Sequence, residues 1–194
     1  MTTGPTTNRI DPIPIPTGRD AVRSALLHHA ADLFAERGPA ATSVRDIADR
    51  ARVNHGLVFR HFGAKENLVA AVLDHLGDLH GPAADLTGTT PTDPDTRRHL
   101  TVLVRCLLDG YPVGRLQQRF PIMTALVDRA AAAGADDRTA ALAAANAAAL
   151  MVGWEMLGPF LRAATGLDDL PEDDLRRDVT ARAARMLDDP TENP

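Results

Sequence analysis

The chain has 194 residues, a length sufficient for one compact domain or for two small ones that share a helix. Its one cysteine, Cys106, excludes an internal disulfide and a cysteine-based metal site, and suits a reducing compartment. The formal net charge is −5, yet residues 1–65 hold nine basic against six acidic residues. This asymmetry favours a molecule whose N-terminal end meets phosphates while the acidic remainder stays clear of them.

Helices account for the predicted elements. Residues 1–18 contain four prolines and are expected to form a disordered arm. Apolar residues at spacings of three and four then predict a helix that begins at Arg19 and ends at Gly38 and Pro39. Three further helices are predicted over 43–51, 54–62 and 65–79, followed by a polar linker over 81–95. Beyond it we expect helices near 95–110, 113–132, 136–165 and 171–188, with kinks or interruptions at Pro121 and Pro159.

The fold class predicted from this pattern is all-α, because few runs alternate with period two and β-branched residues are scarce beside alanine. No signal peptide is expected. The longest apolar stretch, 139–159, is dominated by alanine and carries Asn146 and Glu155, so it is interpreted as a buried or interface helix and not as a membrane span. We therefore predict a soluble, cytoplasmic protein.

Catalysis is not predicted. The chain has no glycine-rich phosphate loop and no nucleophile paired with a base, and the acidic run over 168–174 is typical of a solvated helix start. No cofactor and no metal are expected. His28 and His29 adjoin on a helix and point about 100° apart, so a shared metal is disfavoured. Asp32, four residues after His28, leaves a surface metal pair as the alternative to solvated side chains.

The segment TSVRDIADRARVNHGLVFRHFGAK, residues 42–65, carries the main functional signal. Ser43 and Asp46 have the spacing of a capping box, and Asn54 can cap the following helix. Two short capped helices joined by a tight turn are typical of a helix-turn-helix. The second is about 12 Å long, which suits a B-DNA major groove about 12 Å wide.

Val58 and Phe62 form the inward face of this second helix, so its neighbours are predicted to face outward. Arg60 and His55 could donate to guanine or phosphate, Leu57 could touch a thymine methyl, and Gly56 would allow close approach of the backbone. Phe59 is interpreted as facing DNA, with a core position as the alternative, while His61 is more typical of a packed histidine. The predicted DNA-binding set is Thr42, Ser43, Arg45, Asn54, His55, Gly56, Leu57, Phe59, Arg60, His61 and Lys65.

These residues resemble the DNA-binding domain of the TetR (tetracycline repressor) family over about 50 contiguous positions. The matching residues are Thr42, Ser43, Val44, Asp46, Ile47, Ala48, Ala51, Val53, Gly56, His61, Phe62, Lys65, Glu66 and Leu68. Three positions depart from the family pattern: Arg52 replaces a turn glycine, Phe59 a tyrosine and Ala64 a serine cap. The resemblance implies an all-helical homodimer that binds palindromic operator DNA as a repressor and releases it on binding a ligand, but it implies no particular ligand.

The remainder of the chain is expected to hold the ligand and the dimer interface. Large apolar side chains suit a hydrophobic effector, with Tyr111, Gln117 and Asn146 as further polar candidates. Trp154 fits a pocket wall or ordinary core equally well. The predicted ligand-binding set is Leu103, Cys106, Leu107, Phe120, Met123, Leu126, Met151, Trp154 and Phe160. Residues at helical spacing on the last two helices are predicted to form the interface: Leu142, Leu150, Leu157, Leu175, Val179, Ala183 and Met186.

The predicted organisation is an arm over 1–18, a DNA-binding domain over 19–65, and a ligand-binding and dimerisation domain over 66–194. The predicted function is a ligand-responsive transcriptional regulator that binds double-stranded operator DNA as a homodimer. Two alternatives stay open: a constitutive DNA-binding regulator, and a helical interaction protein that has lost DNA binding.

Overall fold

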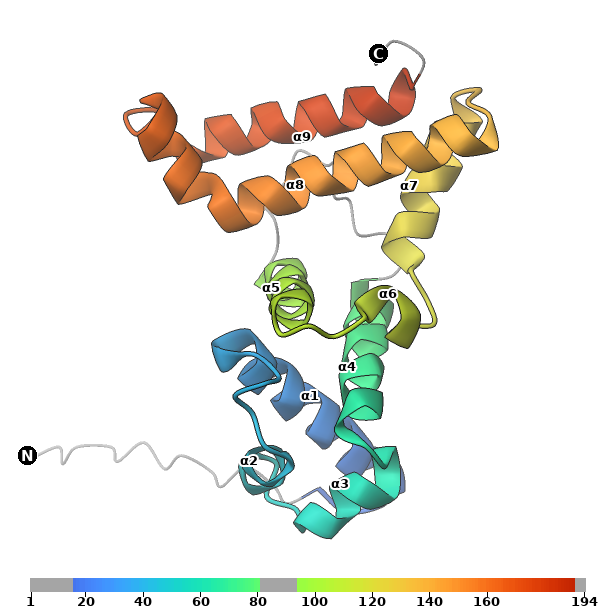
Figure 1. Cartoon of the computed structure of the whole chain (residues 1–194), viewed down its shortest axis with the longest axis vertical. Coiled ribbons are helices and arrows are strands. Elements are labelled where there is room, and N and C mark those ends of the chain that lie inside the picture. Colours follow the sequence, from blue (N-terminus) through green and yellow to red (C-terminus); the bar gives the residue numbers. More distant parts are fainter. Residues whose placement is uncertain (1–15, 81–93, 191–194) are drawn as a thin grey trace, which may run out of the picture.

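The helices of the computed structural model, which describes residues 16–80 and 94–190, form an elongated molecule (Figure 1). Its lower part contains α1 (Arg19–Arg37), α2 (Val44–Arg50), α3 (His55–Phe62) and α4 (Lys65–His80). The middle contains α5 (Pro94–Leu108) and α6 (Val113–Leu116). The upper part contains α7 (Pro121–Ala132) and the long antiparallel pair α8 (Asp137–Thr165) and α9 (Glu172–Asp188). The described residues contain no strand, which confirms the all-α prediction.

Local hydrogen bonds set the starts of several helices. The Ser43 hydroxyl accepts from the Asp46 amide at 3.1 Å, and the Asp46 carboxylate accepts from the Ser43 amide at 2.9 Å, which confirms the predicted capping box. Asn54 caps α3 by accepting from the Gly56 amide at 2.8 Å. Asp136 caps α8 in the same way by accepting from the Thr139 amide. These caps satisfy amides that have no partner inside a helix.

The interruption expected at Pro121 within the helical span 113–132 is confirmed, because α6 ends at Leu116 and α7 begins at Pro121. Proline has no amide hydrogen and disfavours the helical conformation of the residue before it, and Phe120 accordingly adopts φ −126° and ψ 63°. Pro121 therefore opens a helix, a position that proline tolerates well. Pro159 instead lies inside α8, and the C-terminal turns of α8 bend towards α9 as expected for a kink (Figure 1).

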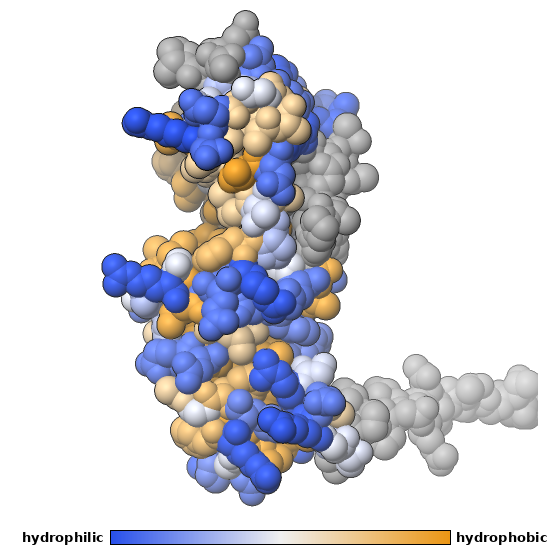
Figure 2. Space-filling view, turned by 90° about the vertical axis from the view of Figure 1, so that its right-hand side faces the viewer, coloured by the Kyte–Doolittle hydropathy of each residue, from blue (hydrophilic) through white to orange (hydrophobic). Residues whose placement is uncertain are grey.

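Two apolar cores hold the molecule together. The first joins α1–α6 through large buried side chains that include Leu26, Phe34, Ile47, Val58 and Leu73. The second joins α7, α8 and α9 and is built mainly from alanines of α8 that allow the helices to approach closely: Ala140, Ala143, Ala144 and Ala147. Viewed from the side of α4, α6 and α7, the surface narrows between the upper helices and the rest, and apolar residues border this narrowing (Figure 2).

Helix α8 is long and apolar enough, by length and composition, to cross a membrane. Its alanine face is nevertheless buried in the second core, and Glu155 forms ion pairs with Arg97 of α5 at 2.7 Å and Arg176 of α9 at 2.8 Å. A carboxylate engaged by two flanking helices fits a helix that packs within the protein. Most of the predicted arm, residues 1–15, and most of the predicted linker, residues 81–93, lie outside the described residues.

Candidate nucleic-acid interface and adjoining cavity

Helix α3 lies at the lower end of the molecule and is held there by one apolar face (Figure 1). Val58 and Phe62 are buried in the first core, as predicted. The Arg23 guanidinium of α1 lies 5.0 Å from the centre of the Phe62 ring, a distance that permits a cation–π interaction from behind the helix. The opposite face of α3 is therefore directed away from the body.

Four of the predicted DNA-binding residues lie on this outer face. His55, Gly56 and Arg60 are exposed, and Phe59 is 55% exposed, so the alternative of a core position for Phe59 is excluded. Arg60 makes no ion pair with any described residue, which leaves its guanidinium available for an anion. An exposed arginine and an exposed aromatic ring on a short projecting helix form a surface that can enter a DNA groove.

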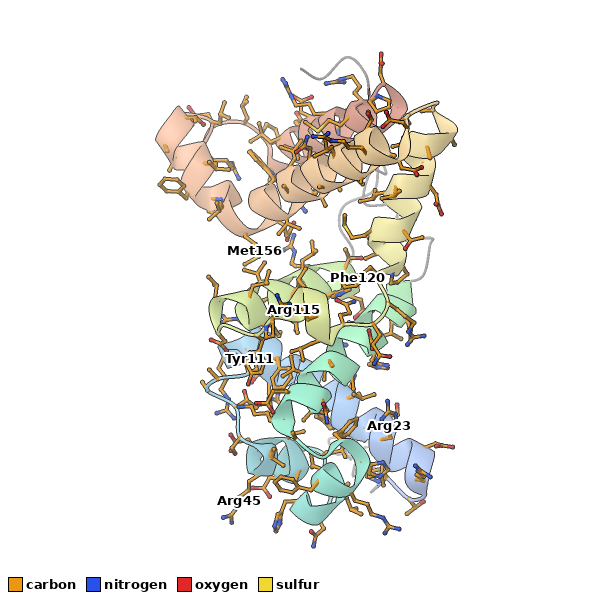
Figure 3. All side chains as sticks on the ribbon, turned by 45° about the vertical axis from the view of Figure 1, so that its right-hand side comes forward. Arg23, Arg45, Tyr111, Arg115, Phe120 and Met156 are labelled. Atoms are coloured by element: carbon orange, nitrogen blue, oxygen red, sulfur yellow. The ribbon has the colours of Figure 1, made fainter. Side chains whose placement is uncertain are left out.

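Other predicted residues surround α3. Arg45 projects from the lower end of α2, away from the body (Figure 3), and lies 3.8 Å from Asp49 in an exposed pair. Ser43 is exposed, although its hydroxyl and amide are occupied in the capping box, whose hydrogen bonds hold the pKa of Asp46 below its ordinary value. Asn54 is exposed and engaged as a cap. Lys65 is half-buried at the start of α4.

Three side chains of the predicted DNA-binding set are buried or half-buried. Thr42 is 1% exposed, and its hydroxyl donates to the Gly38 carbonyl at 2.8 Å, so this side chain cannot contact DNA. Leu57 is half-buried and packs against the first core, because it lies at the edge of the apolar face formed by Val58. His61 is half-buried beside Phe62, with ring centres 6.0 Å apart, in agreement with a packed histidine.

Sequence reasoning missed the contribution of α1 to this surface. Gly18, Arg19 and Val22 form a depression of about 450 Å³ together with Leu57, Arg60 and His61 of α3. Arg19 is exposed at the first position of α1, where the backbone amides also attract anions. The signal that could have identified it is a basic residue at a predicted helix start, but the chain path that brings it beside Arg60 is not visible in the sequence.

A second feature is an apolar cavity of about 230 Å³ between α5, α7 and α8. Four of the predicted ligand-binding residues line it: Leu103, Phe120, Met123 and Met151. Phe120 lies where α7 begins, below α8 (Figure 3). Gln117 is 7% exposed and also lines the cavity, as predicted for a polar group. The lining residues that sequence reasoning missed are His99, Leu100, Pro121, Ile122, Ala148 and Val152.

The other predicted ligand-binding residues do not line this cavity. Cys106 is buried in the first core, where burial raises the pKa of its thiol to about 12, and Tyr111 packs against the same core. Leu126 belongs to the second core. Trp154 borders a separate, polar cavity beside Glu155 and Arg176. The side chains of Leu107, Asn146 and Phe160 are exposed.

Short polar contacts link α5 and the segment between α6 and α7 to α1 and α4. Arg98 of α5 donates to Asp32 of α1 at 2.7 Å, and the amide of Ala40, in the turn after α1, donates to Asp109 at 2.6 Å. Arg119, in the segment between α6 and α7, lies 2.6 Å from Asp78 of α4. These contacts join elements that border the cavity to α1 and α4, which in turn pack against α2 and α3.

Comparisons with known proteins agree with this geometry. Residues 26–72 match the family "Bacterial regulatory proteins, tetR family". The chain is 53% identical over 196 residues to the HTH-type transcriptional repressor Rv3405c of Mycobacterium tuberculosis, covering 97% of this chain and 99% of that protein. It is 42% identical over 89 residues to the HTH-type transcriptional repressor KstR2 of Rhodococcus jostii, covering 45% of this chain and 42% of that protein.

The fold is similar to that of NalD, the secondary repressor of the MexAB-OprM multidrug efflux pump in Pseudomonas aeruginosa. The TM-score is 0.51 at 20% identity, covering 86% of this chain and 97% of NalD. Together with the helix-turn-helix of α2 and α3, the full-length similarity to Rv3405c shows that the chain belongs to the TetR family of transcriptional regulators and is a DNA-binding repressor, not an enzyme.

Proposed function

We propose that two copies of the chain bind a palindromic operator through the outer faces of their α3 helices and that a small hydrophobic ligand in the α5–α7–α8 cavity releases the DNA. The observation that carries this proposal is the exposed face of α3, where Phe59 and Arg60 project beside Arg19 at one end of the molecule. Its setting is the cytoplasm, where the DNA lies.

The DNA-binding set that we retain is Ser43, Arg45, Asn54, His55, Gly56, Phe59, Arg60 and Lys65, together with Arg19. Arg60 and His55 are positioned to read bases, whereas Arg19, Arg45 and Lys65 are positioned to hold phosphates. Phe59 offers an apolar ring for a thymine methyl. The domain boundary at residues 65 and 66 stays a proposal, and the first core extends beyond it into α4, α5 and α6.

The first experiment selects bound sequences from a random DNA pool and measures operator affinity at fixed salt. Arg60→Ala should weaken binding by about 1–3 kcal/mol and relax the preference at one position of each half-site. Arg115→Ala is the matched control, because Arg115 is exposed on α6, distant from α3 (Figure 3). Equal affinities of the two variants would exclude Arg60 as a DNA contact.

Ligand release is proposed from geometry. A dimer must set its two α3 helices about 34 Å apart to occupy successive major grooves. A ligand that favours a different spacing lowers the population competent to bind DNA. In this chain the cavity is lined by α5 and by the start of α7, and contacts such as Arg98–Asp32 and Arg119–Asp78 link these elements to α1 and α4.

The second experiment fills the cavity. Ala148 is half-buried and lines the cavity, so Ala148→Trp should abolish the thermal stabilisation that a hydrophobic compound gives to the wild type, while the protein remains folded. Ala133→Trp, at an exposed position that follows α7, is the control. Compounds that stabilise the wild type should weaken its operator affinity. A compound that fills the cavity and leaves operator affinity unchanged would support a constitutive regulator instead.

A further inference from the structure

Two histidines and an aspartate converge on the side of α1 that lies next to α5. The Asp32 Oδ2 atom is 3.5 Å from His28 Nε2 and 3.9 Å from His29 Nδ1, and the three ligand atoms lie within 4.8 Å of one another. Among the residues that the structure describes, this is the one group of three or more histidine, cysteine or carboxylate side chains that meets so closely. His28 and His29 start about 100° apart around the helix, but their side chains turn so that both imidazoles approach Asp32.

The separations suit a small divalent metal ion. Bonds of about 2.0–2.2 Å from zinc to nitrogen and oxygen place neighbouring ligand atoms of a tetrahedral site about 3.4 Å apart. The distance from Asp32 to His28, 3.5 Å, matches this value, and the distance to His29, 3.9 Å, would have to shorten by about 0.5 Å when an ion binds. Three protein ligands leave the fourth position to water, and His28 is 56% exposed, so an ion can enter from solvent.

Two further observations distinguish this cluster from an ordinary group of solvated side chains. His29 Nδ1 is buried and makes no hydrogen bond in the structure, so a buried polar atom lacks the partner that it normally has. Asp32 uses its other oxygen, Oδ1, to accept from Arg98 at 2.7 Å. This contact fixes the carboxylate and leaves Oδ2 directed at the two imidazoles, in the manner of an outer-shell contact that orients a metal ligand.

We propose that His28, His29 and Asp32 form a binding site for a divalent transition-metal ion, with zinc as the best match. Imidazole nitrogen favours zinc, nickel and copper over magnesium and calcium, which prefer all-oxygen sites. The positive charge of Arg98 opposes any cation, so the site depends on the two nitrogen ligands as well as on the carboxylate. It is separate from the apolar cavity and from the outer face of α3.

The test uses the untagged full-length chain, freed of metal by chelator and dialysis, and titrated with Co²⁺ while visible absorption is recorded. The wild type should bind one Co²⁺ per chain with the spectrum of nitrogen and oxygen ligation, and Zn²⁺ should displace it, whereas excess Mg²⁺ should not. His28→Gln and Asp32→Asn should each weaken Co²⁺ binding at least about tenfold. His55→Ala removes an exposed histidine of α3 and is the control for the metal titration, in which it should bind Co²⁺ like the wild type.

Circular dichroism checks that each variant is folded. Because the His28 side chain is 56% exposed, His28→Gln should not disturb the fold, and a loss of Co²⁺ binding by this variant would report on the site itself. A wild type without saturable Co²⁺ binding would overturn the proposal. Equal binding by the wild type, His28→Gln and Asp32→Asn would overturn it as well, because the ion would then occupy other histidines. Neither result bears on operator binding, so the proposed function is tested independently.

Discussion

At the scale of single residues, the backbone of Arg52 is strained. Among the residues that the structure describes, Arg52 is the one non-glycine residue with a positive φ, 56°, and it lies in the turn between α2 and α3. A left-handed conformation costs a residue with a Cβ about 1–2 kcal/mol, while glycine costs about 0.5–1 kcal/mol in unfolded-state entropy. Arg52→Gly should therefore raise the free energy of unfolding by about 0.5–1 kcal/mol in urea denaturation. Arg52→Ala removes the same guanidinium without relieving the strain. Equal stability of the two variants would show that the change in the free energy of unfolding comes from loss of the arginine side chain and not from relief of backbone strain.

Cys106 provides a second test at this scale. It is the one cysteine of the sequence, its side chain is fully buried, and the pKa of its thiol is raised to about 12 by burial and by Asp109. Because the thiolate is the reactive form, labelling with a thiol reagent at pH 8 should require opening of the first core. The rate should rise steeply near the urea midpoint. Rapid labelling without denaturant would contradict the buried position.

The residues show what the sequence could and could not predict. The caps at Ser43 and Asn54 and the inward positions of Val58 and Phe62 follow from spacing alone, and the structure confirms them. Thr42 and Cys106 were misplaced because a small polar side chain can be satisfied inside a core, here by the Gly38 carbonyl for Thr42. Arg19 was missed because its proximity to Arg60 depends on the packing of α1 against α3.

At the scale of helices, periodicity predicted most of the elements and Pro121 predicted the interruption between α6 and α7, but neither could show in which direction the chain turns there. The four residues between them turn the chain so that the Gln118 amide donates to Asp74 of α4 at 3.3 Å. This turn brings Phe120 and Pro121 to the cavity. Which residues line the cavity therefore depends on the direction in which the chain turns before Pro121, and the sequence does not predict that direction.

The contact between α7 and α9 predicts a pH effect. Arg129 donates two hydrogen bonds to Asp188, at 2.8 and 2.9 Å, and these lower the pKa of Asp188 below its ordinary value of 3.8. A lowered folded-state pKa means that the pair stabilises the protein at neutral pH and that the gain is lost as the pH falls below about 4. Since Asp188 is 57% exposed, solvent screening limits the gain to about 0.5 kcal/mol.

Asp188→Asn should accordingly be slightly less stable than the wild type at pH 7, and the difference in the free energy of unfolding should shrink as the pH falls below about 4. Asp128→Asn, at an exposed position of α7, is the control and should show no such convergence. A difference that persists unchanged at pH 3 would show that Asp188 contributes through packing and not through its charge.

At the scale of the whole molecule, the division into two cores could not be predicted from the sequence. The charge distribution divides the chain into a basic part, residues 1–65, and an acidic remainder. The first core crosses this division, because α4, α5 and α6 share it with α1. The second core is small because it is made largely of alanine, and α8 retains exposed apolar side chains: Leu142 and Leu157 are 54% and 52% exposed, and Phe160 is 67% exposed. In the proposed homodimer, a second copy of α8 and α9 would cover these exposed side chains.

The double variant Leu142→Glu, Leu157→Glu tests this assignment. Opposed carboxylates in a desolvated interface strongly disfavour association, so sedimentation should show a folded monomer for the double variant and a dimer for the wild type. Operator affinity should fall steeply, because one α3 reads only half of a palindrome, and binding should depend on the square of the protein concentration. Leu108→Glu is the control, since Leu108 is 81% exposed at the end of α5. A double variant that remains dimeric would place the interface on a different surface, and the spacing of the two α3 helices would then have to be derived anew.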